Sequence, residues 1–121
     1  MMNSNDFCHI LTDGLSSDQK IRSAAEQRIK TLATSNFGMF LLLCAEELTN
    51  ESKNAKNRQL AATLIKNMIL SMPEFVGKWE QLPVMEKTNV KARVLSTLAS
   101  QDKDIRKAAA LVVASNKRLM F

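Results

Sequence analysis

Apolar residues recur along this chain at intervals of three and four positions, the spacing of an amphipathic α-helix. The pattern is clearest in residues 58–69, RQLAATLIKNMI, where Gln59, Thr63 and Lys66 lie opposite an apolar stripe. It predicts a helix over residues 57–71, which Pro73 ends because the backbone before a proline disfavours the helical conformation. The predicted core stripe of this helix consists of Ala61, Leu64, Ile65, Met68, Ile69 and Met72.

Five more helices are expected from the same periodicity and from capping residues. They cover residues 4–12, 18–34, 36–48 and 83–99, and a last one starts at about residue 102. Short polar residues, whose side chains accept hydrogen bonds from free backbone N–H groups, precede three of these helices. The candidate caps are Ser16, Ser17 or Asp18, then Asn36, then Asp102.

Each predicted helix has an apolar face that we expect to be buried. Residues 37–45 are apolar almost all the way round, which is typical of a helix covered on several sides and favours a place in the middle of a stack. In the other helices the residues expected to point inward are Phe7, Ile10 and Leu11; Ile21, Ala25, Ile29 and Leu32; Val90, Val94, Leu95 and Leu98; and Ile105, Ala108, Ala109 and Val112.

Residues 72–83 break this regularity. They contain two prolines and a glycine, so we predict an irregular excursion rather than a helix. Phe75, Val76 and Trp79 lie within it, and large aromatic side chains bury a large area when they pack. We therefore expect aromatic burial to attach the excursion to the body of the protein.

These elements predict an all-α fold. Six helices with short connections can form a globular bundle, or three antiparallel pairs stacked side by side. Three segments favour the pairs, because each repeats a polar lead, a basic residue, small residues and then aliphatic residues. They are SSDQKIRSAAEQRI, ESKNAKNRQLAATLI and ASQDKDIRKAAALVV, which begin near residues 16, 51 and 99.

Composition limits the class of protein. The 121 residues suit one compact domain, and 45% hydrophobic residues argue against disorder. The net charge of +5 permits a nucleic acid, an anionic membrane or an acidic protein as partner, although the 17 Lys and Arg are spread along the chain. Residues 1–6 lack the basic start of a signal peptide and residues 39–45 are too short to span a bilayer, so we expect a soluble intracellular protein without membrane insertion.

Little in the chain suggests catalysis. His9 is the single histidine, so neither a histidine-rich metal site nor a catalytic triad is expected. The neighbouring Cys8 would point about 100° away on a helix, a poor geometry for a nucleophile and its base. Cys44 lies in an apolar run and is expected in the core, whereas Glu46 and Glu47 are expected to face solvent. We expect no enzyme activity, no metal site and no cofactor.

Several segments, in order from residue 7 to residue 114, resemble the N-terminal region of importin-β-type nuclear transport receptors, the karyopherin-β family. They are LSSDQKIRSAAEQRIKTL, NFGMFLLLCAEELTN, RQLAATLIKNMI, then Trp79, then VKARVLSTLASQDKDIRKAAALVVA. Residues 64–67, LIKN, are most similar to the importin-β branch, although exportins share a related start. Gly38 stands where the family often has proline.

The resemblance implies that residues 1–121 form an α-α superhelix of about three HEAT-type helical pairs, the N-terminal part of a much longer solenoid. The second helix of each pair would line the concave side. The implied function is that of a nuclear transport receptor, found in the cytoplasm, in the nucleus and at the nuclear pore, whose N-terminal repeats bind Ran-GTP in protein import. The other partners implied for a full-length receptor are importin-α or cargo, and nucleoporins.

The polar faces of the second helices are where we expect Ran to bind. Side by side, they would form one surface that mixes charges, amides and small apolar groups, which suits a protein better than a phosphate backbone. Lys66 is the strongest candidate, because it is a flexible cation on a weakly charged face and LIKN matches the Ran-binding helix of the family. The predicted contact residues are Gln27, Lys30, Gln59, Thr63, Lys66, Asn67 and Lys107.

Two other functions stay open. A helical-repeat scaffold unrelated to Ran would share every structural feature and differ only in its partner. A nucleic-acid-binding role rests on the net charge alone, because no aromatic platform lies on a basic face and Trp79 is expected in the core. We therefore expect a protein partner and no nucleic acid.

Overall fold

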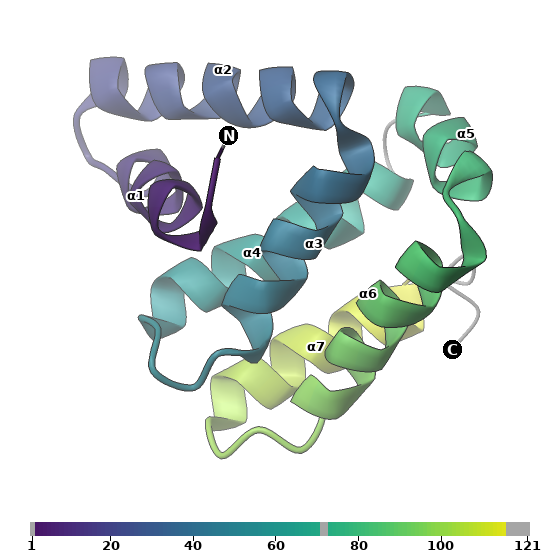
Figure 1. The fold of residues 1–121 in the computed structure, drawn as a ribbon. Helices are drawn as coiled ribbons and strands as arrows, with labels where there is room; N and C mark the ends of the chain where they lie inside the picture. Colours follow the sequence, from purple (N-terminus) through teal and green to yellow (C-terminus); the bar gives the residue numbers. More distant parts are fainter. Residues whose placement is uncertain (1, 71–72, 116–121) are drawn as a thin grey trace.

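The chain forms seven α-helices in residues 2–70 and 73–115, which the computed structural model describes (Figure 1). They are α1 (Ser4–Gly14), α2 (Gln19–Ser35), α3 (Phe37–Thr49), α4 (Ala55–Leu70), α5 (Pro73–Gln81), α6 (Val84–Thr97) and α7 (Lys103–Ser115). The predicted all-α class is confirmed. Within the described part of the chain, the helices are too short or too polar for any of them to cross a membrane.

Short polar side chains set the helix starts. Asn36 and Asp102 cap α3 and α7 as predicted, and Asp18, one of three candidates, caps α2; each accepts from a backbone N–H two or three residues ahead at 2.9–3.2 Å. α4 begins before the predicted Asn57, because the side chain of Asn54 accepts the first free backbone N–H at 2.8 Å. Each cap satisfies a backbone donor that the helix itself leaves unpaired.

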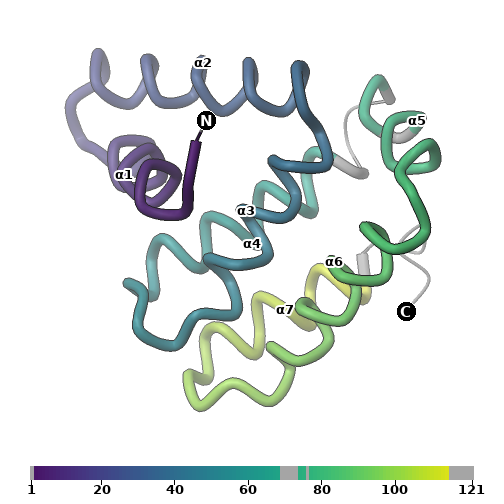
Figure 2. Tube along the Cα trace, in the orientation of Figure 1, coloured from purple at the N-terminus to yellow at the C-terminus, as the bar shows by residue number. Residues whose placement is uncertain are grey.

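The helices stack as pairs. α3 packs on α4 and α6, and α4 packs on α7, so the α3–α4 and α6–α7 pairs lie side by side with α3 and α6 in one layer and α4 and α7 in the other. The tube in Figure 2 shows that α4 and α7 run in the same direction. α1 and α2 pack together at one end of this stack, where α2 runs across α3 rather than alongside it (Figure 1).

The central helix is α3. It packs against α1, α2, α4, α5 and α6, as its apolar circumference predicted. Aromatic rings connect it to two of these neighbours: Phe40 lies edge-on to Phe7 of α1 at 6.3 Å between centroids, and Phe37 stacks on Phe75 of α5 at 5.3 Å. Ring pairs in such arrangements contribute about 0.5–1.5 kcal/mol beyond the area that they bury.

The segment expected to be irregular is a helix, α5. Pro73 occupies its first position, where the missing backbone N–H needs no partner. Phe75 and Trp79 are four residues apart and therefore face the same side, where both are buried. The prediction of an irregular excursion is wrong because the prolines bound the helix instead of interrupting it, but the aromatic burial is confirmed.

Three residues predicted to point inward are more than a third exposed. Ile21 lies in the first turn of α2, beyond the stretch of that helix that covers the core, and Leu95 and Leu98 lie beside the buried line of α6. That line consists of Val90, Val94 and Thr97. The other predicted core residues are buried or half-buried wherever the structure describes their side chains; the side chain of Ile69 and residue 72 lie outside that part.

The repeated sequence segments have a shared structural role. Each of α2, α4 and α7 has an arginine four residues after its capping residue, and a buried alanine three residues later. In the first and last of these helices the arginine donates to the carbonyl of a serine two residues before the cap, at 3.1 and 2.8 Å, and so closes the preceding turn. The three cap and arginine pairs are Asp18 with Arg22, Asn54 with Arg58 and Asp102 with Arg106.

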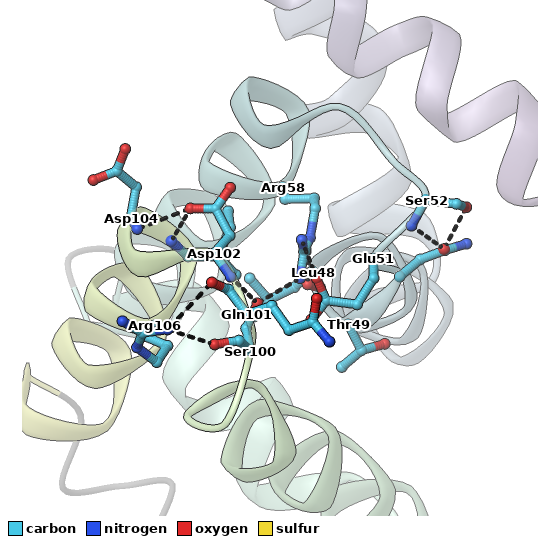
Figure 3. A network of polar contacts seen from close by, with 12 residues as sticks. Leu48, Thr49, Glu51, Ser52, Arg58, Ser100, Gln101, Asp102, Asp104 and Arg106 are labelled. Atoms are coloured by element: carbon cyan, nitrogen blue, oxygen red, sulfur yellow. Dashed lines mark hydrogen bonds and ion pairs between the residues drawn. The ribbon is translucent and has the colours of Figure 1, made fainter.

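Arg58 differs from its two counterparts because its side chain is only 3% exposed (Figure 3). Its Nε donates to the carbonyl of Leu48 at 2.9 Å, and its guanidinium lies 3.2 Å from the Glu51 carboxylate. It also donates to the Ser100 hydroxyl at 3.5 Å, which connects the second helical pair to the turn before α7. The Ser100 hydroxyl, followed by Arg58, lowers the pKa of the exposed Glu51 carboxyl by hydrogen bonding.

Glu47 contradicts the expectation that it faces solvent. It is 3% exposed, and its Oε2 has no hydrogen-bond partner among the described residues. The reason is that α3 is covered on nearly every side, so a polar residue in its last turns is enclosed as well. Burial raises the pKa of the Glu47 carboxyl, while Lys53, a hydrogen bond with Cys8, and Arg58 act in the opposite direction.

We expect Glu47→Gln to raise the free energy of unfolding near pH 8 by about 1 kcal/mol, because the amide keeps the shape without burying a charge. Since the folded-state pKa of Glu47 is raised, its contribution to stability is present below the unfolded-state pKa and is lost as the pH rises through the folded-state value. The benefit of the substitution should therefore disappear below about pH 4. Urea unfolding of wild type and variant at both pH values measures the difference, with Glu46→Gln as the control, and a benefit independent of pH would contradict this account.

Candidate protein interface

A groove of about 380 Å³ lies between α4 and α7. Buried Ala62 and Val112 and half-buried Ala108 form its floor, and longer polar side chains form its rim. The small floor residues follow from the helix contact, because alanine lets two helices approach closely. The complete lining is Gln59, Ala62, Thr63 and Lys66 from α4, and Asp104, Lys107, Ala108, Leu111 and Val112 from α7.

The charges of this groove are two lysines and one carboxylate. Lys66 comes from α4, and Lys107 and Asp104 come from α7. The ion pairs among the described residues are Arg22 with Glu26 and Arg58 with Glu51, so no direct ion pair neutralises the groove lysines. Unpaired ammonium groups beside a neutral floor are able to bind carboxylates from a partner.

The groove collects four of the seven residues predicted as contacts. Gln59, Thr63 and Lys66 line its α4 side and Lys107 lines its α7 side. Gln59 and Lys66 are half-buried and border the groove, as expected for residues on a polar face. Asn67 is exposed on α4 but does not line the groove.

Gln27 and Lys30 lie elsewhere. They line a separate depression of about 340 Å³ with Thr31, Thr34 and Ser35, all from α2. The prediction that the second helices of all three pairs share one surface is therefore wrong for α2. The reason is that α2 crosses over α3 while α4 and α7 run side by side (Figure 1). The second helices of the last two pairs therefore form one row, and α2 does not continue it.

Asp104 and Leu111 also line the groove, although neither is among the predicted contact residues. They lie three residues before and four residues after Lys107, so helical spacing places all three on one face of α7. Leu111 is the largest apolar side chain in the lining and is 50% exposed. Counting outward from Lys107 at helical spacing identifies both residues.

Comparison with known proteins adds to this geometry. Residues 25–100 match the family described as the importin-beta N-terminal domain. The chain belongs to this family. In agreement, it is 32% identical over 119 residues to importin subunit beta-1 of Schizosaccharomyces pombe, an alignment that covers 94% of this chain and 13% of that protein.

Solved importin-beta structures have the same fold. Yeast importin-beta (Kap95p) superposes with a TM-score of 0.89 at 30% identity, over 98% of this chain and 14% of Kap95p. In another structure, Kap95p binding induces the switch loops of RanGDP to adopt the GTP-bound conformation, and there the TM-score is 0.88 at 30% identity, over 98% of this chain and 15% of that one. A Kap95:Nup1 complex gives 0.87 at 30% identity, over 98% and 14%. The predicted importin-β resemblance and the stack of HEAT-type pairs are confirmed, for a chain that spans about one seventh of these relatives.

Proposed function

We propose that this chain is the N-terminal region of a nuclear import receptor and that it binds Ran in its GTP state on the α4–α7 groove. The observation that carries the proposal is that the groove of an importin-beta N-terminal domain gathers Gln59, Thr63, Lys66 and Lys107, four of the five residues expected to contact Ran on α4 and α7. The effect of Kap95p on the switch loops of RanGDP gives further support, because those loops distinguish the two nucleotide states.

The rest of the proposal concerns the receptor as a whole. Its partners would include nucleoporins, in line with the Kap95:Nup1 complex, together with importin-α or cargo. It would act in the cytoplasm, in the nucleus and at the nuclear pore. The role is one of binding rather than catalysis, and it requires no cofactor.

Lys66→Glu should weaken binding of GTP-loaded Ran about tenfold, because it places a carboxylate where an ammonium is expected to contact the partner. Isothermal titration calorimetry with GTP-loaded and GDP-loaded Ran measures the change, and far-UV circular dichroism should show unaltered helicity. Lys20→Glu makes the same charge change on the exposed side of α2 and should leave the dissociation constant unaltered.

Two results would count against the proposal in different ways. If Lys66→Glu binds Ran as well as wild type does, Lys66 does not belong to the contact. If wild type binds neither nucleotide form, the proposed Ran function fails and the general helical-repeat scaffold becomes the better interpretation.

A further inference from the structure

The α4–α7 groove offers side chains and no free backbone. Both of its walls are helices, whose inner N–H and C=O groups already bond to one another, so a partner cannot add a strand there. A volume of about 380 Å³ over a floor of alanine and valine has room for several side chains. The geometry suits a helix that lays one face into the groove, which is a common mode of peptide recognition.

The two ends of the groove differ in chemistry. Because α4 and α7 run in the same direction, Gln59 and Asp104 lie towards the starts of both helices, and Lys66 and Leu111 lie towards their ends. Lys107 lies between these ends. The groove therefore has a carboxylate and an amide at one end, the ammonium group of Lys107 in the middle, and that of Lys66 with an aliphatic side chain at the other end.

At the end of the groove that holds Lys66 and Leu111, the described residues neither neutralise the positive charge nor fully cover the apolar surface. No described residue forms an ion pair with Lys66 or Lys107, and Leu111 remains half-exposed beside the buried Val112. A partner residue that fills this end gains most if it brings a carboxylate for the ammonium groups and an aliphatic side chain for Leu111.

We infer that the groove recognises an amphipathic helix on which an acidic side chain and an aliphatic side chain lie one turn apart. The acidic residue contacts Lys66 and Lys107, and the aliphatic residue packs on Leu111. Asp104 repels phosphates and so disfavours nucleic acid, while a second copy of this chain would bring a net charge of +5 to the same cations. The inference deepens the proposed function by defining the chemistry of the partner, and it relies on that function only for the choice of face.

A displayed library of helical peptides, with every outward position randomised, tests the inference. Selection on the wild-type chain should enrich Asp or Glu three or four residues from Leu, Ile or Met. The best peptide should bind the double variant Lys66→Glu and Lys107→Glu about 100-fold more weakly, because two attractive charge contacts become repulsive. Selection on that double variant should instead enrich Lys or Arg at the acidic position.

Matched variants separate charge from shape. Leu111→Ser should weaken the selected peptide about fivefold while the salt dependence of binding stays the same, because an uncharged contact is lost. The pair Lys20→Glu and Arg28→Glu reverses the same number of charges on α2, outside the groove, and should change affinity less than about twofold. If the charge-reversed groove variant loses helicity, the neutral pair Lys66→Gln and Lys107→Gln replaces it, with about a tenfold loss expected.

The inference is overturned if selection yields no binder, if the enriched peptides lack the acidic residue, or if these peptides bind the groove variants as tightly as they bind wild type. Titration with GTP-loaded Ran is run in parallel. If acidic helices bind the groove while Ran does not, the proposed function is wrong and this inference is supported. If Ran binding depends on Lys66 but the enriched peptides are not acidic, this inference is wrong and the proposed function is supported.

Discussion

Trp79→Ala should lower the free energy of unfolding by about 3–5 kcal/mol, the usual cost of removing a large buried aromatic side chain. Trp79 is 2% exposed and belongs to the same buried cluster as Phe37 and Phe75. α5 has 9 residues, too few for a helix to be stable on its own in water, so it depends on these aromatic contacts. Urea unfolding followed by far-UV circular dichroism measures the loss.

Two neighbouring substitutions calibrate this result. Gln81→Ala changes an exposed residue at the end of the same helix and should alter stability by less than about 0.5 kcal/mol. Trp79→Phe keeps an aromatic ring and should lie between alanine and wild type. A loss below about 1 kcal/mol for Trp79→Ala would mean that the ring does not attach α5 to the core.

Arg58→Met should cost about 3–5 kcal/mol, an effect of similar size from a different cause. The substitution removes the donors that satisfy the Leu48 carbonyl and the Ser100 hydroxyl, both held by a side chain that is 3% exposed. It also removes the buried connection between the second and third helical pairs (Figure 3). Chemical unfolding near pH 7 measures it, and a change of less than about 1 kcal/mol would show that the network does not hold the pairs together.

The chain contains its own control for Arg58. Arg22 has the same place in the first repeat and donates to one carbonyl at 3.1 Å, but its side chain is 40% exposed. Arg22→Met should therefore cost no more than about 1 kcal/mol, since an exposed contact competes with water. Arg58→Lys should recover only part of the loss, because an ammonium cannot reach three acceptors in different directions as a guanidinium does.

The stability of the Arg58 network has a consequence for the groove. Arg58 immediately precedes Gln59, the first groove residue on α4, and its partner Ser100 lies in the turn before α7. The network therefore fixes the starts of the two groove helices relative to each other. We expect Arg58→Lys to widen or shift the groove and so to weaken the proposed binding of GTP-loaded Ran, measured by calorimetry, even where the chain remains folded.

Much of the fold could be predicted because its signals are local. The caps Asp18, Asn36 and Asp102 need only a short polar side chain before a helical stretch, and all three are in place. The prediction fails at α5 because proline breaks a helix in its interior, whereas Pro73 occupies the first helical position. Leu95 shows the opposite limit: periodicity identifies an apolar stripe, but not which of two adjacent stripes the neighbouring helix covers.

The candidate site was predictable only within single helices. Gln59, Thr63 and Lys66 share one face of α4 by spacing alone, and that face does border the groove. That Lys107 lies on the other wall depends on α4 packing beside α7, which the repeated segments suggested. Gln27 and Lys30 fell outside the groove because the crossing of the first pair depends on how α2 fits against α3.

Sequence by itself determined six of the seven described helices, three of their caps, most of the apolar core and the repeated pairing, because hydrogen bonding and side-chain spacing within a helix act over a few residues. Tertiary structure alone decided that Glu47 and Arg58 are buried, that α2 leaves the row, and that Leu111 completes a groove with Lys66. Such features depend on the angles and contacts between helices, which are set by packing among residues far apart in the chain.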